Sequence, residues 1–167
     1  MRSKRLDRHG ALLLTLALLG SALAVTYGEW AAAATPAKAQ GAVEPGWQKV
    51  IARKGGCVMY VPPDWKLDPV LKGAAGLNDN SASAVVSLAD AVSTLAEVKP
   101  VMQNNFEPTK TFEDGPHRLW YQYSTGSRLN FYVGVPVKGG ICGAQIGFKP
   151  GKESIANKIA ASVGAGS

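Results

Sequence analysis

The chain has 167 residues and carries 18 Lys and Arg against 12 Asp and Glu, which gives a net charge of +6. This length is typical of a single domain. The basic residues do not gather into the Lys/Arg cluster that marks a nucleic-acid site, so we expect no nucleic-acid partner.

The first 34 residues have the features of a secretory signal peptide. A basic start, Met1–Gly10, precedes the uncharged apolar stretch Ala11–Val25, and small-residue sites end at Ala24 and Ala34. A helix of the apolar stretch would be about 22 Å long, which is short for a hydrocarbon core of about 30 Å. We therefore expect cleavage after Ala24 or Ala34, with no stable membrane anchor left after processing.

The remaining chain has an ordinary charge and a polar start. Without residues 1–34 it has 14 Lys and Arg and 10 Asp and Glu, a net charge of +4, which suits a soluble surface and permits weak attraction to anionic lipid head groups. Residues 35–46 are rich in Ala, Pro and Gly and are predicted to be a flexible lead-in. Residues 47–167 are predicted to form one domain, located in the periplasm or secreted.

The first half of this domain is predicted to contain short extended segments. Pro62 and Pro63 must end one strand, because proline has no N–H for a sheet ladder. In chain order we expect a strand or helical turn at Gln48–Arg53, a strand at Cys57–Val61, an extended segment at Trp65–Leu67, a polar turn region at Gly73–Ser81 and a strand at Ser83–Ala89.

A helix is predicted over Thr94–Phe106. Thr94 with Glu97 three residues later fits a capping box. Apolar residues then recur with helical spacing and form one face of the helix. They are Leu95, Val98, Met102 and Phe106. Pro100 removes one backbone hydrogen bond, so the helix either kinks there or starts there.

In the second half of the domain, apolar and polar residues alternate as they do in β-strands, and a helix is predicted at the end. Turns about 8–12 residues apart suit an antiparallel sheet. The expected elements are strands at Thr109–Asp114, Arg118–Ser124, Arg128–Val137 and Ile141–Phe148, then a helix at Glu153–Val163 that Gly164 ends. We predict an α+β fold: an α/β/α-type sandwich with a central antiparallel sheet of about six strands and two main helices.

Two cysteines each follow a Lys-Gly-Gly triplet. Cys57 and Cys142 both remain after signal removal, export would place them where disulfides persist, and two cysteines allow one internal pairing. We predict that bridge, which would close a loop of about 86 residues worth at most about 4–5 kcal/mol. It requires their strands to be neighbours or to face each other across the sheet. The alternative is two buried thiols.

Three segments carry a resemblance to a known family. MYVPPDW at Met59–Trp65, RLWYQY at Arg118–Tyr123 and YVGVPV at Tyr132–Val137 resemble segments of the PsbP-like superfamily. That superfamily includes the extrinsic photosystem II protein, envelope lipoproteins and a Ran-binding relative, and the similarity spans about Trp47–Val163. It implies an α/β sandwich that acts mostly as an adaptor or accessory subunit without catalysis. It implies no site residue.

Residues that could carry chemistry are few. The Gly-x-Ser-x-Gly, Walker and His-Glu-x-x-His patterns do not occur. His117 lies near Glu113 and Asp114, which would suit the start of a metal site or a hydrolase, but a solvated hairpin is the favoured interpretation. Asn78–Asn80 is interpreted as a polar turn rather than a calcium site. We expect no catalytic residues, no metal and no cofactor.

Aromatic side chains are the candidate binding residues, namely Trp65, Trp120, Tyr121 and Tyr132. Alternation places Trp120 on one sheet face and Tyr121 on the other. Either helices cover both faces and these rings are core, or one face stays open and binds a partner.

The expected function is that of an exported, non-enzymatic interaction or accessory module. Its partner would be an envelope protein or a small ligand, held on the aromatic sheet face or in a cleft between sheet and helix. The alternatives are a small extracytoplasmic hydrolase that uses His117 and nearby acids, and a purely structural, disulfide-linked envelope protein.

Overall fold

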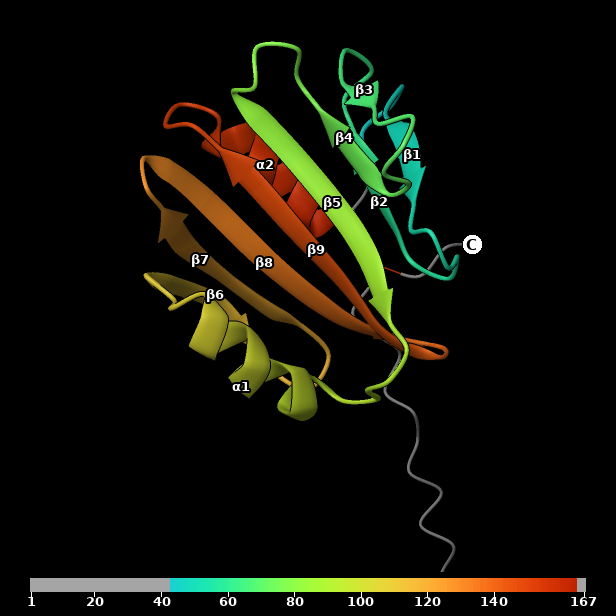
Figure 1. Ribbon diagram of the computed structural model, residues 1–167, viewed down its shortest axis with the longest axis vertical. Coiled ribbons are helices and arrows are strands. Elements are labelled where there is room, and N and C mark those ends of the chain that lie inside the picture. The colour runs from blue at the N-terminus through green and yellow to red at the C-terminus, as the bar shows by residue number, and fades with distance from the viewer. Residues whose placement is uncertain (1–42, 165–167) are drawn as a thin grey trace, which may run out of the picture. The chain divides into compact units, whose positions relative to one another are not determined.

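The structure is a computed structural model that describes residues 43–164. The predicted signal peptide, most of the predicted lead-in and residues 165–167 lie outside the described residues. Figure 1 shows the described elements, which are β1 (Gln48–Ile51), β2 (Val58–Val61), β3 (Lys66–Leu67), β4 (Ala74–Gly76), β5 (Ala82–Ala89), α1 (Leu95–Asn105), β6 (Lys110–Asp114), β7 (Leu119–Thr125), β8 (Arg128–Val137), β9 (Gly140–Phe148) and α2 (Glu153–Ala161).

A central antiparallel sheet organises the fold. Its seven strands lie in the order β3-β4-β5-β9-β8-β7-β6, and β1 pairs with β2 in a separate two-stranded sheet. The last strand, β9, is central because it pairs with β5 on one side and with β8 on the other. The predicted α+β fold with a central antiparallel sheet, two helices and one disulfide is confirmed.

Apolar residues on the two sheet faces form two separate cores. The larger core joins α2 and the β1–β2 sheet to one face of the central sheet, where side chains such as Met59, Phe131 and Ile159 are buried. The smaller core joins α1 to the other face over β7, β8 and β9. In Figure 1, α2 and α1 accordingly lie on opposite sides of the sheet.

The capping box at the start of α1 is formed. The Thr94 hydroxyl oxygen accepts a hydrogen bond from the Glu97 backbone N–H at 3.4 Å, and the Ser93 backbone N–H donates to the Glu97 carboxylate at 3.1 Å. The bond from the Glu97 N–H satisfies a backbone donor that a helix start leaves free, and the bond from Ser93 ties the residue before the cap to the first turn of α1. The helix begins at Leu95 and runs through Pro100, so the expectation that it starts at Pro100 is wrong.

Two expected element boundaries are wrong. The predicted polar turn region Gly73–Ser81 contains β4, because the Ala74–Gly76 backbone pairs with β5 although its side chains are small. The last helix ends at Ala161 rather than Val163. Gly164 does not cap it, since its backbone instead exchanges two hydrogen bonds with Val58, at 2.9 and 3.0 Å.

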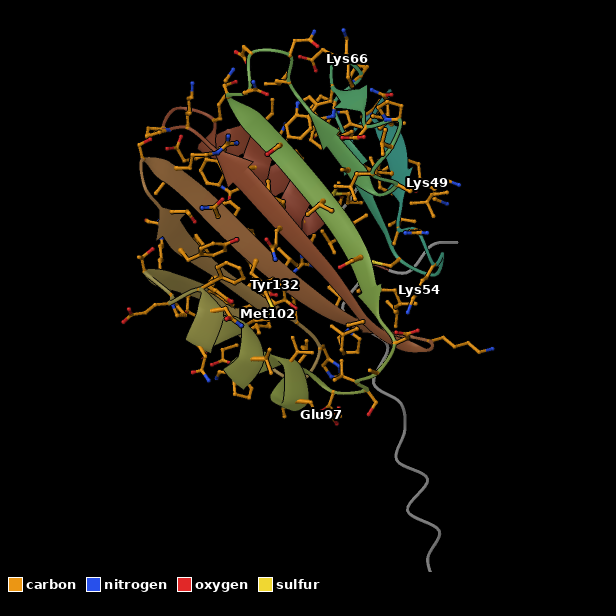
Figure 2. All side chains as sticks on the ribbon, viewed as in Figure 1. Lys49, Lys54, Lys66, Glu97, Met102 and Tyr132 are labelled. Atoms are coloured by element: carbon orange, nitrogen blue, oxygen red, sulfur yellow. A yellow bond between two sulfur atoms is a disulfide. The ribbon has the colours of Figure 1, made fainter. Side chains whose placement is uncertain are left out.

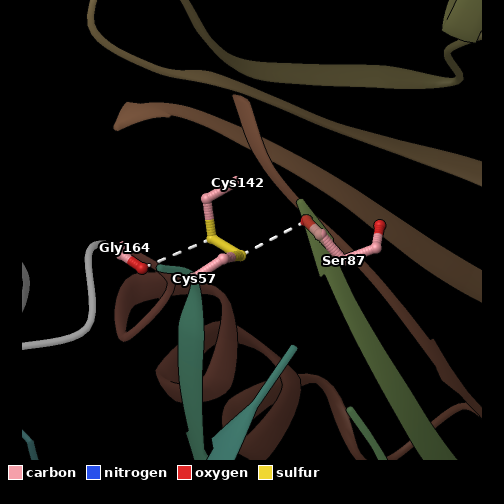
Figure 3. Close-up of a disulfide and its surroundings, with 4 residues drawn as sticks. All are labelled: Cys57, Ser87, Cys142 and Gly164. Carbon is pink, nitrogen blue, oxygen red and sulfur yellow. Dashed lines mark hydrogen bonds between the residues drawn. A yellow bond between two sulfur atoms is a disulfide. The ribbon is translucent and has the colours of Figure 1, made fainter. Parts of the chain in front are cut away.

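The predicted disulfide is confirmed. Cys57 and Cys142 are joined by an S–S bond of 2.04 Å with their Cα atoms 5.2 Å apart. Figure 3 shows the bridge between the carbonyl oxygens of Ser87 and Gly164, each 3.3 Å from a sulfur atom. The bridge crosses from the β1–β2 sheet to the central sheet, and it indicates an oxidising, extracytoplasmic compartment. Within residues 43–164, neither helix has the length and apolar character needed to cross a membrane.

Candidate functional site

The four aromatic candidates do not form one surface patch. Trp65 is 2% exposed in the larger core, and Trp120 is half-buried beside that core, with its ring 4.9 Å from the Phe112 ring. Tyr121 and Tyr132 lie on the opposite face in the smaller core, at 0% and 4% exposure. Their placement matches the alternative in which these rings are core, and a binding role for them stays a prediction.

Tyr132 occupies a special place above a pair of glycines. Gly134 on β8 and Gly143 on β9 are directly opposite each other in the sheet. A Cβ atom at either glycine would lie 3.3–3.4 Å from the Tyr132 hydroxyl oxygen, and one at Gly134 would also lie 2.9 Å from a methyl carbon of Leu95. Glycine inside a strand allows such a close approach, so the Tyr132 ring lies along the sheet under α1.

A pocket of about 250 Å³ lies beside this ring, between α1 and the face of the sheet formed by β5, β8 and β9. Val98, Val101 and Met102 of α1 form its helical wall. Figure 2 shows Tyr132 and Met102 close together where α1 passes over the sheet, with Glu97 further along the helix. The remaining lining comes from the sheet and from the segment that leads into α1, namely Val85, Ser87, Ala89, Val92, Gly143 and Gln145. This largely apolar lining with a few polar groups is typical of small-molecule sites.

Two hydrogen-bond donors line the pocket without a partner in the described part of the chain. The Tyr132 hydroxyl makes no hydrogen bond to a described residue. Neither does the side-chain nitrogen (Nε2) of Gln145, which is the cross-strand neighbour of Tyr132. The Gln145 side-chain oxygen is occupied, because the Tyr123 hydroxyl donates to it at 3.4 Å. Neither atom is among the fully buried atoms without a partner, so both reach solvent through the pocket, and an acceptor on a bound molecule would pair with them there.

The charge state of the site at neutral pH follows from its surroundings. Burial raises the pKa of Tyr132 to about 12, so its hydroxyl keeps its proton and acts as a donor. Hydrogen bonds from the Ser93 N–H and the Thr94 hydroxyl lower the pKa of Glu97, so the pocket has one carboxylate. That carboxylate already caps α1 and is exposed, which places the charge at the rim.

A second, more open hollow of about 670 Å³ adjoins the pocket. It runs along β3, β4 and β5 and shares Val85 and Gln145 with the pocket. Its outer border is formed by Leu67 of β3 and by the loop between β3 and β4, including Leu71. The two hollows together follow the part of the sheet that α1 leaves uncovered.

The residues around His117 do not converge on it. His117 is exposed. Of the two acids near it in sequence, Glu113 pairs with Arg118 at 3.4 Å and Asp114 pairs with Lys99 at 2.5 Å. Within residues 43–164, no group of three or more His, Cys, Asp and Glu side chains is placed to hold a metal ion.

The Asn78–Asn80 segment forms an exposed turn. The Asp79 carboxylate accepts hydrogen bonds from both the backbone N–H and the hydroxyl of Ser81, at 2.9 and 2.7 Å. These local bonds lower the pKa of Asp79. The carboxylate therefore organises the turn, as the sequence pattern predicted.

Sequence reasoning missed most of the pocket. Ser87 and Gly143 are small residues without a motif, and Val98 and Met102 were assigned only to an apolar helix face. One signal was present: Gly134 and Gly143 interrupt two strand patterns, and glycine within a strand often marks close packing against another group.

No family model matches the chain, and no curated protein matches it. The resemblance to the PsbP-like superfamily stays a prediction.

Proposed function

We propose that the chain is an exported, non-enzymatic binding module that holds a small apolar ligand in the pocket between α1 and the sheet. The observation that carries this proposal is a mostly apolar pocket in which Tyr132 and Gln145 present unpartnered donors. The ligand class that suits it is a compact apolar molecule with at least one acceptor, such as a carbonyl or ether oxygen.

Export rests on two supports of different kinds. The sequence of residues 1–34 predicts a secretory signal, and the Cys57–Cys142 bridge favours an oxidising compartment. A periplasmic or secreted location follows from them as a proposal. A PsbP-like relationship is proposed on the resembling segments, and an accessory role without catalysis would agree with it.

The hydrolase alternative has less support. A general base must reach the proton that it removes, and an acid partner normally orients it. His117 is exposed while Glu113 and Asp114 pair with basic residues. Substituting His117→Ala tests this alternative, because a hydrolase built on His117 would lose activity and a binding module would keep its ligand.

The pocket is tested with a neutral apolar dye, N-phenyl-1-naphthylamine, whose fluorescence rises in apolar surroundings. Ser87→Phe places a large ring in the pocket from an exposed strand position, so the fold should tolerate it. We expect saturable dye binding to the unmodified protein, weakened at least about tenfold, which is about 1.4 kcal/mol, by Ser87→Phe.

The control is Ser124→Phe, which adds the same ring at an exposed position of β7 outside the pocket. It should bind the dye as the unmodified protein does. If Ser87→Phe and Ser124→Phe bind the dye with equal affinity, the pocket between α1 and the sheet is not the binding site.

A further inference from the structure

Arg128 places a guanidinium on the pocket side of the central sheet. It is the half-buried first residue of β8. Its guanidinium lies over Gly147 of β9, where an added Cβ atom would be 3.4 Å from Nη2 and 3.5 Å from Nε. Gly147 follows Gln145 by two residues, so that Cβ would point to the same sheet face as the Gln145 side chain. The guanidinium and the pocket therefore share one face of the sheet.

Neutral oxygens hold this guanidinium in place. Nη2 donates to the Gly147 carbonyl at 3.1 Å and to the Ser83 hydroxyl at 3.3 Å, and Nη1 donates to the Asn80 carbonyl at 3.2 Å. The Nε–H has no partner in the described part of the chain, and Nε is not among the fully buried atoms without a partner, so this donor reaches solvent. No carboxylate of residues 43–164 forms an ion pair with Arg128.

The acids around the two hollows are engaged away from Arg128. Asp68, which lines the open hollow along β3, β4 and β5, accepts hydrogen bonds from two backbone N–H groups of its own loop. Asp79 accepts hydrogen bonds within its own turn, and Glu97 caps α1 at the rim of the pocket. Lys66 also lines the open hollow and has no ion-pair partner among the described residues. This side of the sheet therefore favours an anionic group on a ligand.

The guanidinium borders the place where the pocket meets the open hollow. Val85 and Gln145 line both hollows, and Ser83, which accepts a hydrogen bond from Arg128, lines the open one. Ser83 precedes Val85 by two residues on β5, which is about 7 Å along a strand. Val85, Gln145 and Tyr132 lie opposite one another on adjacent strands. The guanidinium is thus one row of side chains, about 7 Å, from the row that carries the two unpartnered donors of the pocket.

A carboxylate on an apolar chain fits these features together. Each of its two oxygens can accept a hydrogen bond of about 3 Å, so the group can span a separation of about 7 Å between Arg128 and the donors of Tyr132 and Gln145. The attached chain then lies along the apolar wall that α1 gives the pocket. The reverse orientation is disfavoured, because the head group would meet the Glu97 carboxylate at the first turn of α1 and like charges repel.

We propose that the pocket holds an apolar carboxylate, such as a straight-chain fatty acid, and that Arg128 selects its charged head group. The inference rests on the proposed function and specifies the ligand class of the same site. The carboxylate accepts a hydrogen bond from the Arg128 Nε–H, and the chain lies under α1. Charge-assisted hydrogen bonds of this kind are stronger than those of a neutral ligand, so Arg128 makes the site prefer the acid.

The test compares two ligands that have the same chain and different head groups. Decanoate is charged at neutral pH and decanol is not, and each is titrated against the protein carrying the dye N-phenyl-1-naphthylamine. We expect decanoate to displace the dye at a concentration at least about tenfold lower than decanol does. This preference should shrink at high salt, because salt screens the charges.

Two uncharged variants and one matched control assign the preference to Arg128. Arg128→Gln should bind the dye as the unmodified protein does, and decanoate and decanol should then displace it equally. Arg128→Met should behave in the same way and keeps the aliphatic packing of the side chain. Arg53→Gln removes the same charge from the exposed turn after β1, outside both hollows, and should keep the preference. A purely structural role of Arg128 would change stability without changing the ratio of the two concentrations.

The outcomes separate this inference from the proposed function. Equal displacement by decanoate and decanol in the unmodified protein would overturn the inference, while the dye binding itself would uphold the pocket. A preference that persists in Arg128→Gln and Arg128→Met would overturn it as well. If the unmodified protein binds no dye, the proposed function fails and the carboxylate inference fails with it.

Discussion

Tyr132 and its neighbours show how single residues set the properties of the α1 face. Tyr121, Tyr123 and Tyr132 are all buried there, with the Tyr121 and Tyr132 rings 5.5 Å apart. Burial raises the pKa of each of the three hydroxyls, and that of Tyr132 reaches about 12. The folded state therefore favours the protonated phenols more than the unfolded chain does.

This difference predicts a loss of stability in alkali. Since the pKa values are higher in the folded state than the ordinary value of 10, the contribution is fully present below pH 10 and is lost as pH rises toward 12. We expect the urea midpoint, followed by circular dichroism, to fall across that range. Tyr132→Phe should make the fall shallower. An unchanged urea midpoint between pH 10 and 12 would contradict the raised pKa values of these tyrosines in the folded state.

At the scale of elements, α1 depends on its capping box. Thr94→Ala removes the hydroxyl that bonds the Glu97 backbone N–H and carboxylate. We expect a loss of about 1 kcal/mol in the free energy of unfolding, measured by urea denaturation. Ser93→Ala is the matched control, because Ser93 bonds Glu97 mainly through its backbone N–H. If Thr94→Ala lowers the free energy of unfolding no more than Ser93→Ala does, the hydrogen bonds of the Thr94 hydroxyl do not stabilise α1.

The sequence predicted those helices and strands whose residues carry the signal themselves, such as a helix cap or an apolar–polar alternation. Thr94 and Glu97 marked the start of α1 within one residue, and alternation found β8 with its observed bounds. Ala74–Gly76 was missed because Ala and Gly have low strand propensity, and their extended conformation comes from pairing with β5. Such pairing depends on residues distant in sequence, which a local pattern does not contain.

At the scale of the whole described fold, the two sheet faces are covered unequally. The β1–β2 sheet and α2 cover one face, while α1 covers the other over β7, β8 and β9. The side chains of β5 that point to the α1 side, such as Ser83, Ser87 and Ala89, are therefore exposed. The pocket exists because of this unequal cover, so the sequence could predict a cleft between sheet and helix only in general terms.

The disulfide links the β1–β2 sheet to the central sheet covalently. Its cysteines are 85 residues apart in sequence. Replacing both by serine should lower the free energy of unfolding by up to about 4–5 kcal/mol, because the unfolded chain regains the entropy of an open loop. The check is urea denaturation of the oxidised protein beside the Cys57→Ser, Cys142→Ser double variant. Coincident curves would show that the bridge adds no stability.

Native mass spectrometry of the protein purified from its own cell envelope tests the central claim most directly. The binding account predicts a stoichiometric small-molecule mass on the unmodified protein and on Ser124→Phe, and its loss from Ser87→Phe, whose added ring fills the pocket. A protein without any bound small molecule, or one that carries the same mass in Ser87→Phe, would contradict a ligand site between α1 and the sheet.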